Sequence, residues 1–284
     1  MDVLEVGQRS FVFSFHEPFL TNVYVILGQK AAYLCDTFLG PDAITQILSW
    51  FSENGYDLRR FFVFYSHYHY DHVWGTCTLD SSTVIAHEKC RDLLLEHGES
   101  EIQEYGESMI GDVTLVLPNI TLRLRIELHH ENLIFWHTPG HTSDCASLYD
   151  SEDSVLFVGD NVESPIPYVN TPDIDGYLKS LESYLEMDWD LLVPSHDPPM
   201  NDANLIRENI DYLSRFWSEE FDSSFDEEAT SIRHARNLAT VAKCEEMGKS
   251  ISLEYLRRAR EIVERFVDNP TAIKLLKELD ELSS

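Results

Sequence analysis

Three histidines and an aspartate fall within six consecutive positions of this chain, in the order His67-Tyr68-His69-Tyr70-Asp71-His72. The preceding residues 61–65 are aromatic and β-branched and too few for a helix, so they predict a short buried strand. Just past its end, His67 and His69 should point the same way, because strand side chains alternate. Asp71 and His72 must then turn toward a second point. Imidazole and carboxylate groups bind zinc and similar metals, so this segment predicts part of a metal site that needs further ligands downstream.

Three candidate ligands follow downstream, each just after a short apolar run that predicts a strand. They are His141 in Thr-Pro-Gly-His, Asp160 in Gly-Asp and His196 in Ser-His. Strands of one sheet that end on the same side deliver such residues to one place. The recurrence of this layout indicates a metal site more strongly than any one of the motifs.

With these residues in this order, the chain resembles the metallo-β-lactamase fold superfamily over roughly residues 1 to 200. The resemblance implies an α/β (α+β) chain folded as an αββα sandwich, with a dinuclear metal site at one edge. One metal would be held by His67, His69 and His141, and the other by Asp71, His72 and His196, with Asp160 bridging the two.

Two divalent ions roughly 3.5–4 Å apart can share a hydroxide, which is a nucleophile at neutral pH. The sequence contains no Gly-x-Ser-x-Gly motif and no P-loop, so we expect water rather than a side chain to attack the substrate. The expected cofactors are two zinc ions, with iron and manganese as alternatives. Asp71 would be a metal ligand that could also pass a proton to the leaving group.

The position of Asp160 is a cysteine in many class B β-lactamases, so the chain looks more like glyoxalase II, lactonases, ribonuclease Z-type nucleases and phosphodiesterases. Few basic residues stand near the motifs to hold glutathione, and the acidic composition argues against nucleic acid substrates. We therefore expect a hydrolase acting on a small neutral or apolar ester, thioester or lactone. Its substrate wall is expected in the proline-rich loop 163–172, through Tyr168 and Ile166. The acidic stretch 98–112 is either a second rim of the pocket or a surface connection.

Two other functions stay open at this point. Persulfide dioxygenases of the same fold hold a single iron with residues equivalent to His67, His141 and Asp160, and their second site is usually degraded. A binding module that kept the fold and lost catalysis is the other alternative. The complete ligand set weighs against both, and metal analysis would separate them.

The net charge of −29 is concentrated in residues 1–200, which hold 9 Lys and Arg against 32 Asp and Glu. A nucleic-acid-binding protein should have a basic face, so we expect no nucleic acid partner. Solubility explains the acidity more simply than adaptation to high salt. No apolar run reaches the ~18 residues of a membrane span, and the first residues do not resemble a signal peptide. Five scattered cysteines indicate reduced thiols and a cytoplasmic protein.

We expect a catalytic domain over residues 1–222 and a helical appendage over 223–284, which packs beside the active site or forms a homo-oligomer contact. Asp36 follows a predicted strand, and it either accepts a hydrogen bond from a metal-bound histidine or bonds its own turn. His87 and His137 are expected to pack rather than bind metal. The remaining predicted elements are three strands within 4–38, helices over 41–54 and 89–97, and strands over 83–87, 113–117 and 121–127.

Overall fold

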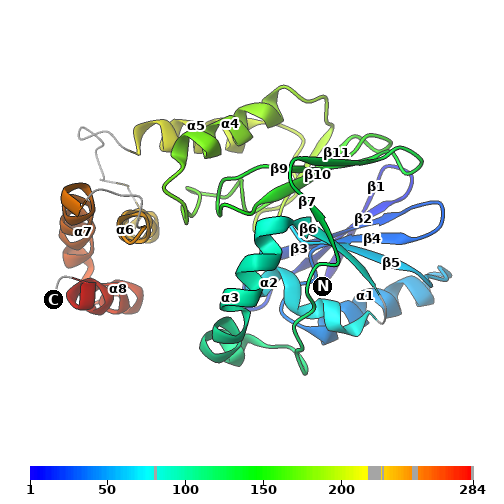
Figure 1. Cartoon of the computed structure of the whole chain (residues 1–284), viewed down its shortest axis with the longest axis horizontal. Coiled ribbons are helices and arrows are strands. Elements are labelled where there is room, and N and C mark those ends of the chain that lie inside the picture. Colours follow the sequence, from blue (N-terminus) through cyan, green and yellow to red (C-terminus); the bar gives the residue numbers. More distant parts are fainter. Residues whose placement is uncertain (80–81, 217–224, 226, 245–248, 283–284) are drawn as a thin grey trace.

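The computed structural model describes residues 1–79, 82–216, 225, 227–244 and 249–282. Two β-sheets lie face to face, with helices covering the outer face of each (Figure 1). The predicted αββα sandwich is confirmed, and helices follow it at the C-terminal end of the chain.

The first sheet has seven strands in sequence order. The first four strands pair antiparallel and the last four pair parallel. They are β1 (Asp2–Val6), β2 (Ser10–Phe15), β3 (Thr21–Leu27), β4 (Ala32–Cys35), β5 (Phe61–Phe64), β6 (Thr83–His87) and β7 (Ile120–Leu122).

The second sheet has five strands in the order β12-β11-β10-β9-β8, and only β11 and β12 run parallel. They are β8 (Arg125–Leu128), β9 (Leu133–His137), β10 (Ala146–Asp150), β11 (Val155–Gly159) and β12 (Leu191–Pro194).

Side-chain alternation builds the core on both faces of the first sheet. Val12 of β2 points between the sheets, whereas Phe11 and Phe13 point outward to the helices. Between the sheets, Phe64 and Phe135 meet edge to face with ring centres 5.1 Å apart. Fully buried apolar side chains of this kind supply most of the driving force that holds two sheets together.

Four helices form the outer layers. α1 (Pro41–Glu53) and α3 (Glu88–Tyr105) cover the first sheet, and α4 (Ile174–Leu185) and α5 (Asn204–Arg215) cover the second (Figure 1). Asp173 caps α4 by accepting a hydrogen bond from the Gly176 amide.

Three further helices lie together beside the sandwich: α6 (Glu228–Ala242), α7 (Lys249–Val263) and α8 (Pro270–Leu282) (Figure 1). Leu238, Ile262 and Leu275 are fully or almost fully buried in one core cluster with Leu181 of α4 and Leu213 of α5. The predicted boundary between residues 222 and 223 lies outside the described residues, so the division into two domains stays a prediction. None of the helices in the described ranges is both long and apolar enough to cross a membrane.

Several predicted elements are wrong in extent. A fourth N-terminal strand, β1, precedes the three expected ones, and helix α3 runs on through Gly98 to Tyr105. Residues 113–117 do not form a strand. Leu115 packs on Gly98 of α3 so closely that a Cβ added at Gly98 would lie 2.6 Å from Leu115 Cδ1. This contact replaces strand pairing.

Candidate metal centre

Strand ends deliver the predicted ligands to one edge of the sandwich. Gly159 adopts a φ of 58°, and a Cβ there would lie 2.7 Å from Ser66, so glycine lets the loops after β5 and β11 approach closely. Asp71 and His72 lie on the single-turn helix α2 (Tyr70–Val73). The other ligands follow strands: His67 and His69 after β5, His141 after β9, Asp160 after β11 and His196 after β12.

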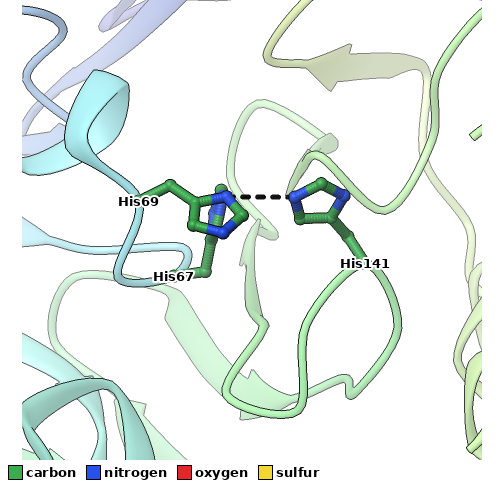
Figure 2. A group of neighbouring side chains, drawn as sticks. All are labelled: His67, His69 and His141. Carbon is green, nitrogen blue, oxygen red and sulfur yellow. Dashed lines mark hydrogen bonds between the residues drawn. The ribbon is translucent and has the colours of Figure 1, made fainter. Parts of the chain in front are cut away.

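His67, His69 and His141 form the first group, and Figure 2 shows their rings turned toward one another from two loops. The Nδ1 atom of His69 lies 3.0 Å from His67 Nε2 and 3.2 Å from His141 Nε2. Three ring nitrogens thus converge on one point.

The outward-facing nitrogens of this group already have partners. His67 Nδ1 lies 3.0 Å from Ser66 Oγ, whose hydroxyl donates to Asp36, so the ring nitrogen donates to Ser66. His141 Nδ1 donates to the Tyr168 carbonyl at 3.2 Å. In these tautomers both Nε2 atoms carry lone pairs that face His69. A metal cation satisfies such an arrangement.

Burial keeps the first group in its metal-binding form. Burial and the neighbouring His141 lower the pKa of His69 to about 3. Burial likewise lowers the pKa of His67 and of His141 below the ordinary value for histidine. All three rings are therefore neutral at pH 7, which is the state that coordinates metal.

Asp71, His72 and His196 form the second group. The Asp71 carboxylate lies 3.5 Å from His72 Nε2 and 3.4 Å from His196 Nε2. His196 Nδ1 donates to the Leu20 carbonyl at 2.8 Å, which leaves Nε2 facing the site. Burial opposes the charge on His72 and His196, but Asp160 and Asp71 raise the pKa of both well above the ordinary value. A metal ion can replace the protons that these pairs would hold.

Asp160 lies between the two groups. Its Oδ1 is 3.3 Å from His72 Nε2, and its Oδ2 is 3.3 Å from His196 Nε2 and 3.7 Å from His141 Nε2. Although Asp160 is buried, His196 and His72 hold its carboxyl pKa well below the usual range. His72 Nε2 and Asp160 Oδ1 face each other as an ion pair, but neither buried atom has a hydrogen-bond partner in the described part of the chain. Such unsatisfied atoms and this donor set fit divalent metal ions.

The structure resolves the two alternatives for Asp36 in favour of the metal site. This fully buried carboxylate accepts hydrogen bonds from His72 Nδ1 at 2.8 Å and from the Ser66 hydroxyl and amide at 2.7 Å each. It therefore orients His72 directly and His67 through Ser66.

A cavity of about 570 Å³ opens over the metal ligands, within the size range of small-molecule sites. Of the two predicted substrate contacts, Tyr168 lines this pocket. Ile166 does not: it is 5% exposed and packs in the core behind the loop. From the acidic stretch 98–112, only Tyr105 reaches the pocket, from the last turn of α3.

Sequence reasoning missed several lining residues. Tyr70 stood inside the metal motif and stacks on Tyr105 with ring centres 4.4 Å apart, so its position was a usable signal. Glu163, Ser164 and Asn170 also line the pocket, and they lie in the loop 163–172 that was predicted as its wall. Phe19, Leu20 and Arg233 carried no sequence signal, because tertiary packing alone brings them to the pocket.

The C-terminal helices support the pocket wall. Asn237 of α6 is buried, donates to the Pro167 carbonyl and accepts from the Val169 amide. Asn209 of α5 likewise exchanges two hydrogen bonds with the backbone of Glu163. Helix α6 thus packs beside the candidate site, as one of the two sequence alternatives expected.

The remaining histidines lie outside the metal groups. His87 and His137 stack with ring centres 3.8 Å apart and bond backbone carbonyls, as the packing role predicts. His129 and His130 are exposed in the turn between β8 and β9. All five cysteines are free thiols, and none belongs to a metal group of the described residues.

An αββα sandwich with a His/Asp cluster at its edge defines a class of metal-binding proteins, and comparison with known proteins identifies the family. The model of the metallo-beta-lactamase superfamily matches residues 16–196. The chain belongs to this superfamily. A metallo-beta-lactamase type 2 from Pseudomonas aeruginosa is 28% identical over 137 residues, 48% of this chain. The chain spans about half (49%) of the length of that curated relative.

Solved structures share the fold. A metallo-beta-lactamase from Hirschia baltica matches with a TM-score of 0.58 at 18% identity, over 75% of this chain and 97% of its own. FIM-1 from Pseudomonas aeruginosa, solved in its mono-zinc form, matches with a TM-score of 0.61 at 15% identity, over 75% and 95%.

Proposed function

We propose that this chain is a zinc-dependent hydrolase that binds two metal ions and acts on a small ester, thioester or lactone. The observation that carries the proposal is the position of Asp160 between two complete ligand groups at the floor of a pocket. The mono-zinc form of FIM-1 supports zinc as the metal.

His67, His69 and His141 would hold one ion and Asp71, His72 and His196 the other, with Asp160 contacting both. Ions bound there would supply Lewis acidity and activate water as the nucleophile. Tyr168 and Tyr105 would exclude solvent and position the substrate over the ligands.

Two carboxyl groups at the pocket can accept and donate protons. Asp71 is buried, but His72 and His196 lower its carboxyl pKa, so it stays ionised. It can therefore accept a proton and then pass it to the leaving group. Glu163 also lines the pocket, and burial together with Asp160 raises its carboxyl pKa to about 7. A carboxyl group with that pKa exchanges protons at neutral pH.

The proposal is tested by elemental analysis and by a substrate panel on zinc-loaded protein, with esters, thioesters, lactones and a β-lactam. We expect about two zinc ions per chain and turnover of at least one ester-type substrate. Asp160→Ala should lower the occupancy of both sites. Uptake of a single iron without a second metal would favour the dioxygenase alternative, and full zinc loading without turnover would favour the silent module.

A further inference from the structure

One basic side chain stands in the wall of this pocket. Arg233 of α6 is the only lysine or arginine among the described residues that line it. Its Nη1 donates to the carbonyls of Ser164 at 2.8 Å and Ile166 at 2.9 Å. Its guanidinium carbon lies 4.3 Å from the centre of the Tyr168 ring. These contacts hold a half-buried cation against the substrate wall.

Among the described residues, Arg233 has no carboxylate partner. Its hydrogen bonds to them go to the neutral carbonyls of Ser164 and Ile166, and it forms no ion pair with any of their acidic side chains. By contrast, Arg236, one turn further along α6, bonds Glu278 at 2.8 Å. In a chain with 50 acidic and 21 basic residues, an arginine that lines a pocket and pairs with no described carboxylate can bind a ligand through its remaining donors.

The chemistry of guanidinium decides what that ligand is. Its planar fork of five donors matches the two oxygens of a carboxylate or phosphate, and two carbonyls do not use up those donors. Glu163 lines the same pocket and lies near enough for its charge to interact with Arg233, but the two groups are not in contact.

The pocket also provides a path between Arg233 and the metal ligands. Phe19, Tyr70 and Tyr105 line it together with His69 and His141, so one small molecule can meet aromatic surface, metal ligands and guanidinium at once.

We propose that Arg233 determines specificity by binding an anionic group, a carboxylate or phosphate, carried by the substrate away from the hydrolysed bond. This rests on the proposed function and replaces the neutral substrate expected from the sequence. The substrate would be an ester, thioester or lactone with a negative charge.

The kinetic test compares two esters that differ only at the far end, p-nitrophenyl valerate and mono-p-nitrophenyl glutarate, on zinc-loaded protein. A charged hydrogen bond is worth enough that Arg233→Gln should raise the KM of the glutaryl ester at least about ten-fold more than that of the valeryl ester. Arg233→Lys should recover part of this difference. Arg236→Gln, on the same helix but ion-paired with Glu278 and not among the described residues that line the pocket, should leave the ratio of the two KM values unchanged.

Equilibrium binding tests Arg233 without turnover. Calorimetry on wild type, Arg233→Gln and Arg236→Gln would give Kd values for valerate, glutarate and 4-phosphonobutyrate. We expect glutarate to bind wild type at least about ten-fold more tightly than valerate, and Arg233→Gln to remove that preference. Tighter binding of the phosphonate would assign the group to phosphate.

The two proposals fail in different ways. The role of Arg233 would be overturned if both esters are hydrolysed and Arg233→Gln raises their KM values by the same factor. It would also be overturned if Arg233→Gln still binds glutarate more tightly than valerate. Equal weakening of valerate and glutarate would also overturn it, because loss of loop support alone acts on both. If wild type turns over neither ester but shows the glutarate preference, the hydrolase proposal fails and the anion site stands.

Discussion

Asp36 is the residue through which the core of the first sheet orients the metal ligands. Its carboxylate accepts from His72 Nδ1 and from Ser66, and Ser66 in turn accepts from His67. In an asparagine at this position, the side-chain NH2 group would replace Oδ2 and would face two other donors, the Ser66 hydroxyl and His72 Nδ1. The ring of His72 must then turn or exchange its tautomer.

We therefore expect Asp36→Asn to weaken zinc binding by about 10- to 100-fold, the usual cost of losing such a partner. Competition with a chromophoric chelator measures this. Asp150→Asn is the matched control, because Asp150 is equally buried and bonds Arg9 at 2.6 Å instead of a metal ligand. An Asp36→Asn protein with wild-type zinc affinity would show that Asp36 does not position His72.

His87 gives the fold a pH dependence at a site separate from the metal ligands. Its Nε2 donates to the Arg123 carbonyl and its Nδ1 accepts from the Lys89 amide, so the folded state needs the neutral ring. Burial and the stacked His137 lower the pKa of His87 to about 4. The stability that the neutral His87 ring contributes is fully present above about pH 6.5, the pKa of histidine in the unfolded chain. This stability is lost as the pH falls through about 4.

We expect wild type to lose about 1–2 kcal/mol more stability than His87→Asn between pH 7 and pH 4, after allowance for solvent screening. Asparagine keeps the helix-capping acceptor without titrating. Urea unfolding at both pH values measures the difference, with His97→Asn on the surface of α3 as the control. Parallel losses in wild type and His87→Asn would contradict this assignment.

Among the elements, loop 163–172 separates substrate binding from metal binding. Tyr168 lines the pocket, its ring lies against the Arg233 guanidinium, and its backbone carbonyl accepts from His141. Removal of the side chain should therefore spare the ligands.

We expect Tyr168→Ala to change KM or substrate preference by several-fold, on the scale of a lost aromatic and cation–π contact, with zinc content intact. His196→Ala should do the reverse, lowering zinc content and the rate for every substrate. Tyr149→Ala, a half-buried tyrosine on β10, is the control. If Tyr168→Ala matches wild type across the panel, Tyr105 of α3 becomes the better candidate for the wall.

These elements differ in how far the sequence could predict them. Local signals predicted the strand ends, because each is a short apolar run followed by a polar residue. These ends carry His67, His141, Asp160 and His196. The path of residues 113–117 was not, because Leu115 packs on Gly98 through a contact that no local pattern encodes.

The same distinction holds at the pocket. Tyr168 was predicted because its loop begins beside Asp160, whereas Ile166 in the same loop points into the core. Arg233 could not be found from the sequence. It lies on a helix whose periodicity reports only a buried face, and tertiary packing alone turns it toward Tyr168.

On the scale of the whole molecule, the charge limits which anions can approach. The chain carries a net charge of −29, and the pocket has one described basic side chain, Arg233. A small carboxylate or phosphate bound at that guanidinium interacts mainly with charges within the ~10 Å Debye length at 0.1 M salt. A polyanion extends well beyond it and meets the acidic surface.

We therefore predict no measurable binding to DNA or RNA, even at low ionic strength where electrostatic attraction would be strongest. Gel-shift assays at about 20 mM and 150 mM salt measure this, with single- and double-stranded probes. A small anion such as glutarate should still bind at both salt concentrations, which would separate the local effect of Arg233 from the repulsion of the whole chain. Tight binding of nucleic acid that weakens as salt is added would refute the prediction, because it requires a basic face that the acidic composition of the chain argues against.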